Sequence, residues 1–488
     1  MSGLGNRTAI LTLSRLASYG LMLISPIFLV RLLTVADFGR YREFLLYASI
    51  LQALAQFSIN DSLLYCVPAN PGSPWRLARQ TALLTLCSSA LVVLILAVLD
   101  SGSGGWLVNG YLAPLVAYTL FSVNLDFWEY FWLANGRSKP VFVYSATRLT
   151  ARVVVVVITA TLTHEVRAII WALVALEGAR LAAAAVVMLL LDRSRQEPPL
   201  KEPWRDQLRF CIPSGIASLL AMLNRNLSNV IVARTLGAVA LAQYAIGRFG
   251  EPVVATVRNS VSSVILPEMV RKDRGNPASG GALALWQKAT VVNAILLFPI
   301  AVLVVRYAQP LVTMVFGASY AHAALIMQIY MLVVVRECFD FAPALRAVNR
   351  TRPLVESNVA GLLACAVAML LLIPTAGLAG AMIAFVIASY VDALWLGWRT
   401  LQSYGVRVGE ILPWRSIARA ALAAVVASVL IANSVWTDIF GRAGIVLAGL
   451  VYLTAFALLL QVLRIPEAVV LQAWGKRLVF RRASQAGS

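Results

Sequence analysis

Long apolar segments separated by short polar breaks recur along the whole chain. Each segment holds about 20 residues, which is the length an α-helix needs to cross the hydrocarbon core of a bilayer. The pattern therefore predicts an all-α polytopic membrane protein with about 14 transmembrane helices. The predicted spans are 9–33, 43–66, 80–99, 110–134, 141–163, 168–191, 208–233, 244–268, 286–306, 320–345, 355–373, 377–398, 416–434 and 444–463.

Composition agrees with lipid as the solvent. Hydrophobic residues make up 60% of the chain and charged residues 13%, whereas about a quarter of the residues in a soluble protein are charged. The cysteines lie singly and there are two histidines, so we predict neither a metal site nor a disulfide framework. The sequence contains no catalytic motif and no loop large enough for a catalytic domain, so we expect no cofactor and no enzymatic activity.

The charge distribution predicts the topology. On the N-terminal side of the predicted helices, loops and tails hold 23 Lys and Arg residues, against at most seven on the opposite side. Lys and Arg accumulate in the cytoplasmic loops of membrane proteins. We therefore expect a bacterial inner-membrane protein with both termini in the cytoplasm. The net charge of +19 then needs no nucleic-acid partner. The basic tail at 476–482 is expected to contact anionic lipid headgroups.

A weak internal repeat divides the chain. Residues 30–41 follow the first predicted helix and residues 233–244 follow the seventh, and Arg, Leu and Tyr coincide at an offset of 203. A unit of six helices returns the chain to the same side, so the two copies have parallel orientation. We therefore predict an N-lobe at 1–200 (helices 1–6), a C-lobe at 201–400 (helices 7–12), and helices 13 and 14 with a basic cytoplasmic tail at 401–488.

Short motifs follow one another in an order found in one superfamily. They are Arg31-Leu32-Leu33 with the predicted turn Phe38-Gly39-Arg40-Tyr41, Ile265-Leu266-Pro267-Glu268-Met269, Val315-Phe316-Gly317-Ala318-Ser319-Tyr320, and the loop Pro374-Thr375-Ala376-Gly377-Leu378-Ala379-Gly380-Ala381. In these motifs residues 1–400 resemble the polysaccharide flippases of the multidrug/oligosaccharidyl-lipid/polysaccharide exporter superfamily. The resemblance implies two six-helix lobes around a central cavity. It also implies export of undecaprenyl-pyrophosphate-linked oligosaccharide, often coupled to an ion gradient.

Several charges inside the predicted spans have a partner close in sequence. Asp126 and Glu129 lie on one face of the fourth helix, and Arg148 and Arg152 lie on one face of the fifth. We expect these four to neutralise one another, since sequential helices commonly touch. Two further self-contained groups are expected, the pair of Glu177 and Arg180 and the cluster of Arg336, Glu337 and Asp340, with Arg336 facing Asp340.

Other intramembrane cations are candidates for the substrate. A charge in the bilayer persists where it is paired or faces a wet cavity, and Arg is suited to a pyrophosphate because its planar fork binds phosphate oxygens in pairs. The substrate-binding candidates are Arg15, Arg225, Arg248 and Arg258. Asp61 and Glu251 are the ion-coupling candidates, because a desolvated carboxyl group can carry a proton.

Three functions remain open from the sequence. The first is an oligosaccharide-lipid flippase, with membrane lipids as partners. A polysaccharide polymerase and a chain-length regulator are further candidate partners. The second is a multidrug/cation antiporter of the same superfamily, which would require an acidic cavity instead of unpaired Arg residues. The third is a membrane polysaccharide polymerase or ligase, which would require larger external loops.

Overall fold

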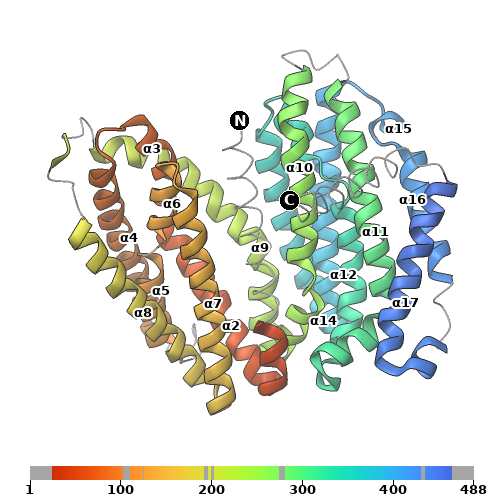
Figure 1. The fold of residues 1–488 in the computed structure, drawn as a ribbon, viewed down its shortest axis with the longest axis horizontal. Helices are drawn as coiled ribbons and strands as arrows, with labels where there is room; N and C mark the ends of the chain where they lie inside the picture. Colours follow the sequence, from red (N-terminus) through yellow and green to blue (C-terminus); the bar gives the residue numbers. More distant parts are fainter. Residues whose placement is uncertain are drawn as a thin grey trace, which may run out of the picture. The chain divides into compact units, whose positions relative to one another are not determined.

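The structure is a computed structural model, and it describes residues 25–102, 110–124, 126–191, 196–198, 203–273, 281–429 and 435–463. Within these ranges the regular elements are helices, without any strand. The chain forms two compact units, residues 1–242 and 243–488 (Figure 1). The predicted lobe boundaries at residues 200 and 400 stay a prediction, and each unit is described by itself below.

Unit 1 is a bundle in which α8 packs against α5 and α7, while α2 packs against α4 and α5. The short helices α3 and α6 lie against each other at one end of the bundle. The helices are α2 (Val35–Gln56), α3 (Leu63–Ala69), α4 (Pro74–Gly102), α5 (Leu112–Val123), α6 (Phe127–Ala134), α7 (Ser138–Thr163), α8 (Val166–Leu191) and most of α9 (Pro203–Gly247).

Unit 2 is built around α11, which contacts α10, α12, α16 and α17 (Figure 1). Its core includes the fully buried Trp286 of α11. The elements are α10 (Glu251–Asp273), α11 (Gly281–Phe316), the 3₁₀ turn η3 (Ala318–Tyr320), α12 (Ala323–Glu337), α13 (Ala342–Ala347), α14 (Arg352–Tyr404), α15 (Val408–Ile411), α16 (Trp414–Val429) and α17 (Val435–Val462).

Seven of the described helices are long and apolar enough to cross a membrane. One of them, α14, contains a pair of predicted spans. In α14 the spans 355–373 and 377–398 meet at Gly377, whose φ of 54° and ψ of −129° interrupt the helix. A Cβ at Gly380 would lie 2.1 Å from the Leu372 backbone oxygen, so glycine permits this reversal. The prediction of an all-α polytopic membrane protein is confirmed.

The predicted start of the second span is wrong. Residues 35–41 are helical and not part of a turn, because the Thr34 hydroxyl accepts a hydrogen bond from the Asp37 N–H at 3.1 Å and caps α2. The predicted end at residue 66 is also wrong. α2 stops at Gln56, since Phe57 and Ser58 take positive φ values of 38° and 55°. Asp61 consequently lies in the turn before α3 and not late in a helix.

The two units share a repeat that the sequence comparison at offset 203 missed. Helix four breaks between α5 and α6, and helix ten breaks between α12 and α13. Each short second helix closes in the same way: Arg137 N–H donates to Trp132 O at 2.8 Å, and Arg350 N–H donates to Leu345 O at 2.9 Å. Both pairs are offset by 213 residues (350 − 137 and 345 − 132). Gly136 and Asn349, again 213 apart, have φ values of 71° and 56°. The matching turns support the predicted parallel repeat.

Gly39 should be essential for the packing of α2 against α9. A Cβ at this position would lie 2.0 Å from the Ala238 backbone oxygen, a distance that forces the backbones apart. We expect Gly39→Ala to cost about 1–3 kcal/mol of stability, measured as a lower thermal midpoint of the purified protein. Gly449→Ala is the control, because that position in α17 has nothing within 4 Å. Equal midpoints for the two variants would contradict the close approach.

Candidate functional site

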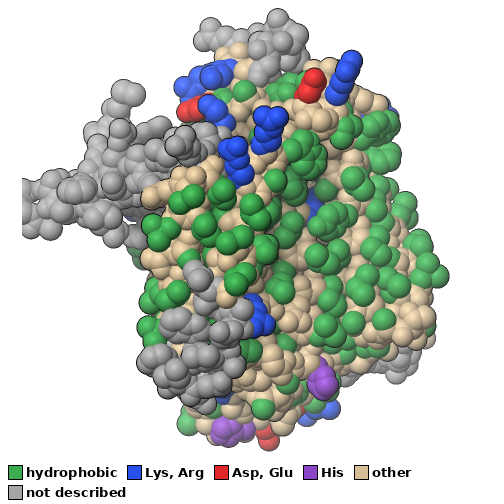
Figure 2. Space-filling model, turned by 90° about the vertical axis from the view of Figure 1, so that its right-hand side faces the viewer, with side chains coloured by type: hydrophobic (Ala, Val, Ile, Leu, Met, Phe, Trp, Pro, Cys, Tyr) green, Lys and Arg blue, Asp and Glu red, His purple; other side chains and the backbone are tan. Residues whose placement is uncertain are grey.

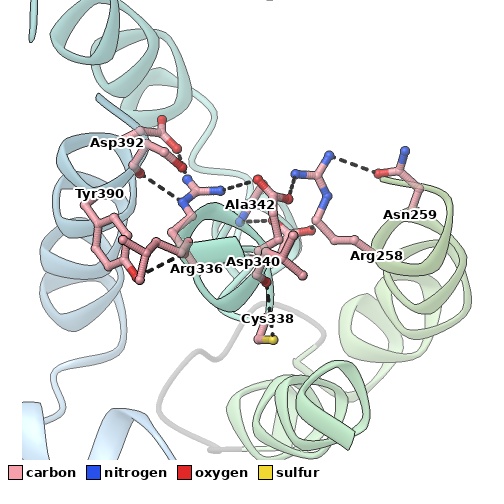
Figure 3. A network of polar contacts seen from close by, with 12 residues as sticks. Arg258, Asn259, Arg336, Cys338, Asp340, Ala342, Tyr390 and Asp392 are labelled. Atoms are coloured by element: carbon pink, nitrogen blue, oxygen red, sulfur yellow. Dashed lines mark hydrogen bonds and ion pairs between the residues drawn. The ribbon is translucent and has the colours of Figure 1, made fainter. Parts of the chain in front are cut away.

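A network of charged side chains gathers in unit 2 where α12 breaks off (Figure 3). Arg336 and Glu337 end α12, and Asp340 follows in the break before α13. Arg258 reaches the network from α10, and Asp392 reaches it from α14. The break exposes backbone groups that a continuous helix would satisfy, and Asp340 accepts the Ala342 N–H there at 3.2 Å.

Arg336 is the centre of this network. Its side chain is 9% exposed, and it forms ion pairs with Asp392 and with Glu337, the latter at 3.0 Å. Its Nε also donates to the backbone oxygen of Ser389 at 2.9 Å. Arg336 therefore joins α12 to the second half of α14, and each of its three guanidinium nitrogens donates a hydrogen bond in a buried position.

Arg258 shares Glu337 with Arg336. It pairs with the Glu337 carboxylate directly, and its Nε lies 3.9 Å from Asp340. Asp340 accepts a hydrogen bond from the Ser262 hydroxyl at 2.9 Å. Glu337 thus has two guanidinium partners, while Arg258 is 27% exposed at its side chain.

A cavity of about 230 Å³ opens beside these groups. Its charged lining comprises three guanidinium groups and two carboxylates, together with amides and hydroxyls from α10 and α14. Such a lining can hold water and offers donors to an anion or to sugar hydroxyls. The polar lining residues are Arg258, Asn259, Ser262, Arg336, Asp340, Arg346, Ser357, Asn358 and Asp392.

The expected pair of Arg336 and Asp340 is wrong. α12 ends at Glu337, so Asp340 does not stand one turn further along the same helix face, and Arg336 turns to Asp392 instead. Arg258 also has a carboxylate partner that sequence proximity did not indicate. Glu337 follows it by 79 residues, and the packing of α10 against α12 brings them together.

Arg248 lies in the turn between α9 and α10 and is 6% exposed. It donates to Glu251 at 2.8 Å, and its guanidinium carbon lies 4.1 Å from the centroid of the Phe385 ring. This cation–π contact and the ion pair satisfy the charge in place. Glu251 is therefore bound to Arg248, as its position three residues later allowed.

Arg225 differs from Arg258 and Arg248. It is exposed on α9, twelve residues before the kink at Gly237, which is roughly 18 Å at 1.5 Å per residue. With the residues that the structure describes it forms no ion pair. Arg15 lies outside the described residues. The substrate role of all four arginines stays a prediction.

Unit 1 confirms part of the expected neutralisation. Arg148 pairs with Asp126 at 2.6 Å and with Glu129 at 3.5 Å, and Arg180 pairs with Glu177. Arg152 forms no ion pair with Asp126 or Glu129, so the expected neutralisation does not extend to it.

Asp61 of unit 1 lies near the Tyr130 hydroxyl of α6. Within the described residues Asp61 forms no ion pair.

These features define a multi-pass membrane protein with a transporter fold. The chain matches the lipid II flippase MurJ in an inward closed conformation with a TM-score of 0.65 and 13% identity, over 94% of this chain and 99% of that one. It matches an inward-facing multidrug resistance transporter of the MATE family with a TM-score of 0.57 and 14% identity, over 80% and 96%. At these identities the likeness concerns the fold.

The family follows from the sequence. A family model described as "Polysaccharide biosynthesis protein" matches residues 28–325, more than half of the chain, and the chain belongs to this family. The resemblance inferred from the motifs is thereby confirmed. No curated protein sequence matches the chain.

Proposed function

We propose that this protein translocates undecaprenyl-pyrophosphate-linked oligosaccharide repeat units across the bacterial inner membrane, for cell-surface or exopolysaccharide synthesis. Membership of the polysaccharide biosynthesis family and the fold shared with a lipid II flippase support a lipid-linked sugar substrate. The charge bias of the loops supports cytoplasmic termini. A polymerase that joins the exported units and a chain-length regulator are the proposed partners.

The observation that carries this proposal is the cavity beside Arg258. Removing the sole partner of a buried charge costs about 3–5 kcal/mol. Glu337 avoids this cost when Arg258 turns away, because it still pairs with Arg336 at 3.0 Å. Arg258 is therefore releasable to a pyrophosphate, whose oxygens its guanidinium binds in pairs. The amides and hydroxyls of the same cavity suit the sugar. Arg248 has no comparable arrangement, because its guanidinium is buried against Phe385.

Arg225 of unit 1 is a separate candidate for contact with the substrate. A charge deep in hydrocarbon costs at least about 2.5–3.5 kcal/mol, so an exposed Arg in the middle of a membrane-crossing helix requires water or an anion beside it. Asp61 is the preferred ion-coupling residue, because it forms no ion pair within the described residues, whereas Glu251 already neutralises Arg248.

A complementation experiment tests the function and Arg225 together. In a strain without its own oligosaccharide-lipid flippase, the chain should restore surface polymer and remove accumulated lipid-linked repeat units. Arg225→Ala should lower export roughly 10- to 100-fold, the loss expected for hydrogen bonds of about 1.5–3 kcal/mol to a charged group. Arg209→Ala is the control, since Arg209 is exposed near the first turn of α9. No restoration by the unmodified chain would overturn the function; equal export by both variants would remove Arg225 from it.

The cation antiporter is the alternative, because the MATE fold matches and carboxylates line the cavity in unit 2. An efflux assay with cationic drugs in a sensitised host separates the two functions. We expect no change in drug tolerance, since each described carboxylate of the cavity network already pairs with Arg or accepts a hydrogen bond.

A further inference from the structure

A second cavity lies at the start of α16, outside the proposed substrate site. Its volume is about 380 Å³, and it is lined by Gly409, Leu412, Pro413, Trp414, Arg415 and Ser416. The loop carrying it is fixed in place, because Gln287 of α11 donates to the backbone oxygens of Glu410 at 2.7 Å and Ile411 at 3.2 Å. The Trp414 indole donates to Val408 O at 3.4 Å and remains half exposed, as interfacial tryptophans do.

The exposed stripe of α16 is cationic at its start and apolar further along the helix. Arg415, Arg419, Leu422 and Val426 follow at helical spacing and share one face, and all four are exposed. The opposite face, with Ile417, Ala420 and Ala424, is buried in contacts with α11 and α17. A face that begins with two guanidinium groups and continues with exposed apolar residues matches a phospholipid, whose charged headgroup leads to its acyl chains.

The charge at the head of this stripe is uncompensated within the described part of the chain. Neither Arg415 nor Arg419 forms an ion pair there. Both lie near the N-terminus of α16, where the helix dipole is also positive and disfavours cations. Figure 2 shows Lys and Arg side chains gathered near the upper end of the face formed by α15 to α17, above a broad apolar band.

We propose that the cavity at Trp414 and Arg415 is a binding site for one anionic phospholipid. Arg415 and Arg419 bind its phosphate, the cavity takes the rest of the headgroup, and an acyl chain lies along Leu422 and Val426. A zwitterionic headgroup brings its own cation and cannot neutralise the two guanidinium groups. This site is independent of the proposed substrate site and of the function proposed above.

Native mass spectrometry of the full-length protein tests the proposal. The protein is extracted from vesicles of phosphatidylcholine with a minority of phosphatidylglycerol, and the retained phosphatidylglycerol is counted. Arg415→Ala with Arg419→Ala should weaken retention roughly 30-fold, which corresponds to about 1 kcal/mol for each cation near an anionic lipid. The paired Lys variants should keep most of the binding. Arg352→Ala is the control, because Arg352 is also exposed but pairs with Glu356 at 3.2 Å.

Equal retention by the double Ala variant and the unmodified protein would overturn the site. Displacement of phosphatidylglycerol by inorganic phosphate alone would also overturn it, since a site for free phosphate does not need the apolar stripe. Leu422→Asn separates the two sources: weaker retention of phosphatidylglycerol in this variant supports the lipid, and unchanged retention contradicts it. The elution profile of each variant on size exclusion shows that it is folded.

Discussion

Replacing Arg258 with Ala is expected to lower export of the lipid-linked oligosaccharide at least roughly 100-fold while the protein still folds. The loss follows from two charge-assisted hydrogen bonds to the pyrophosphate, each contributing about 1.5–3 kcal/mol. The protein still folds because both carboxylates retain partners. Glu337 remains paired with Arg336, and Asp340 still accepts hydrogen bonds from the Ser262 hydroxyl and the Ala342 N–H. Export is measured as surface polymer in a flippase-deficient strain, normalised to protein in the membrane.

Two further variants of α10 sharpen this result. Arg271→Ala removes an exposed guanidinium that hydrogen-bonds to Pro267 O of its own helix, and it should leave export unchanged. Arg258→Lys keeps the charge but loses the bidentate geometry, so export should fall between the other two. Undiminished export by Arg258→Ala would show that the cavity beside it does not receive the substrate.

Replacing Arg336 with Leu should have the largest effect on stability. The change leaves Asp392 without its ion-pair partner and removes one of the two cations on Glu337. Breaking a buried ion pair from one side costs about 3–5 kcal/mol because the other charge stays behind. We expect a lower thermal midpoint for the purified protein and a lower yield of folded protein in the membrane.

The double variant Arg336→Leu with Asp392→Leu provides the control for this prediction. Replacing both partners with apolar residues removes the stranded charge, and such replacements are often neutral. Glu337 keeps Arg258 in both variants. The double variant should therefore recover much of the stability lost by Arg336→Leu. If it is no more stable than the single variant, the pair of Arg336 and Asp392 is not the source of the effect.

The sequence alone predicted an all-α chain of long apolar helices, because lipid demands about 20 apolar residues for each crossing. It also predicted the ion pairs of Arg148 with Asp126 and of Glu177 with Arg180, whose members lie on one helix or on consecutive helices. The motifs identified the superfamily, which the family model over residues 28–325 then supported.

Hydropathy did not predict the interruptions within those helices. The break between α5 and α6 coincides with Asp126, whose carboxylate binds Gln56 of α2 at 2.8 Å. The break between α12 and α13 coincides with Asp340, which binds Ser262 of α10. In both cases the partner that stabilises the non-helical backbone lies on a helix distant in sequence, so the hydropathy of the span contains no trace of it.

The sequence by itself determined the surroundings of each segment, that is, which stretches enter lipid and which loops stay in water. It also determined which charged residues lie inside the predicted spans, where a charge is costly. What the tertiary structure decided is the partner of each charge. Glu337 joins Arg258 to Arg336, and Asp392 completes the network from α14. Burial depends on one residue and its neighbours in the chain, whereas an ion pair depends on which helices pack together, and that packing follows from contacts along their whole length.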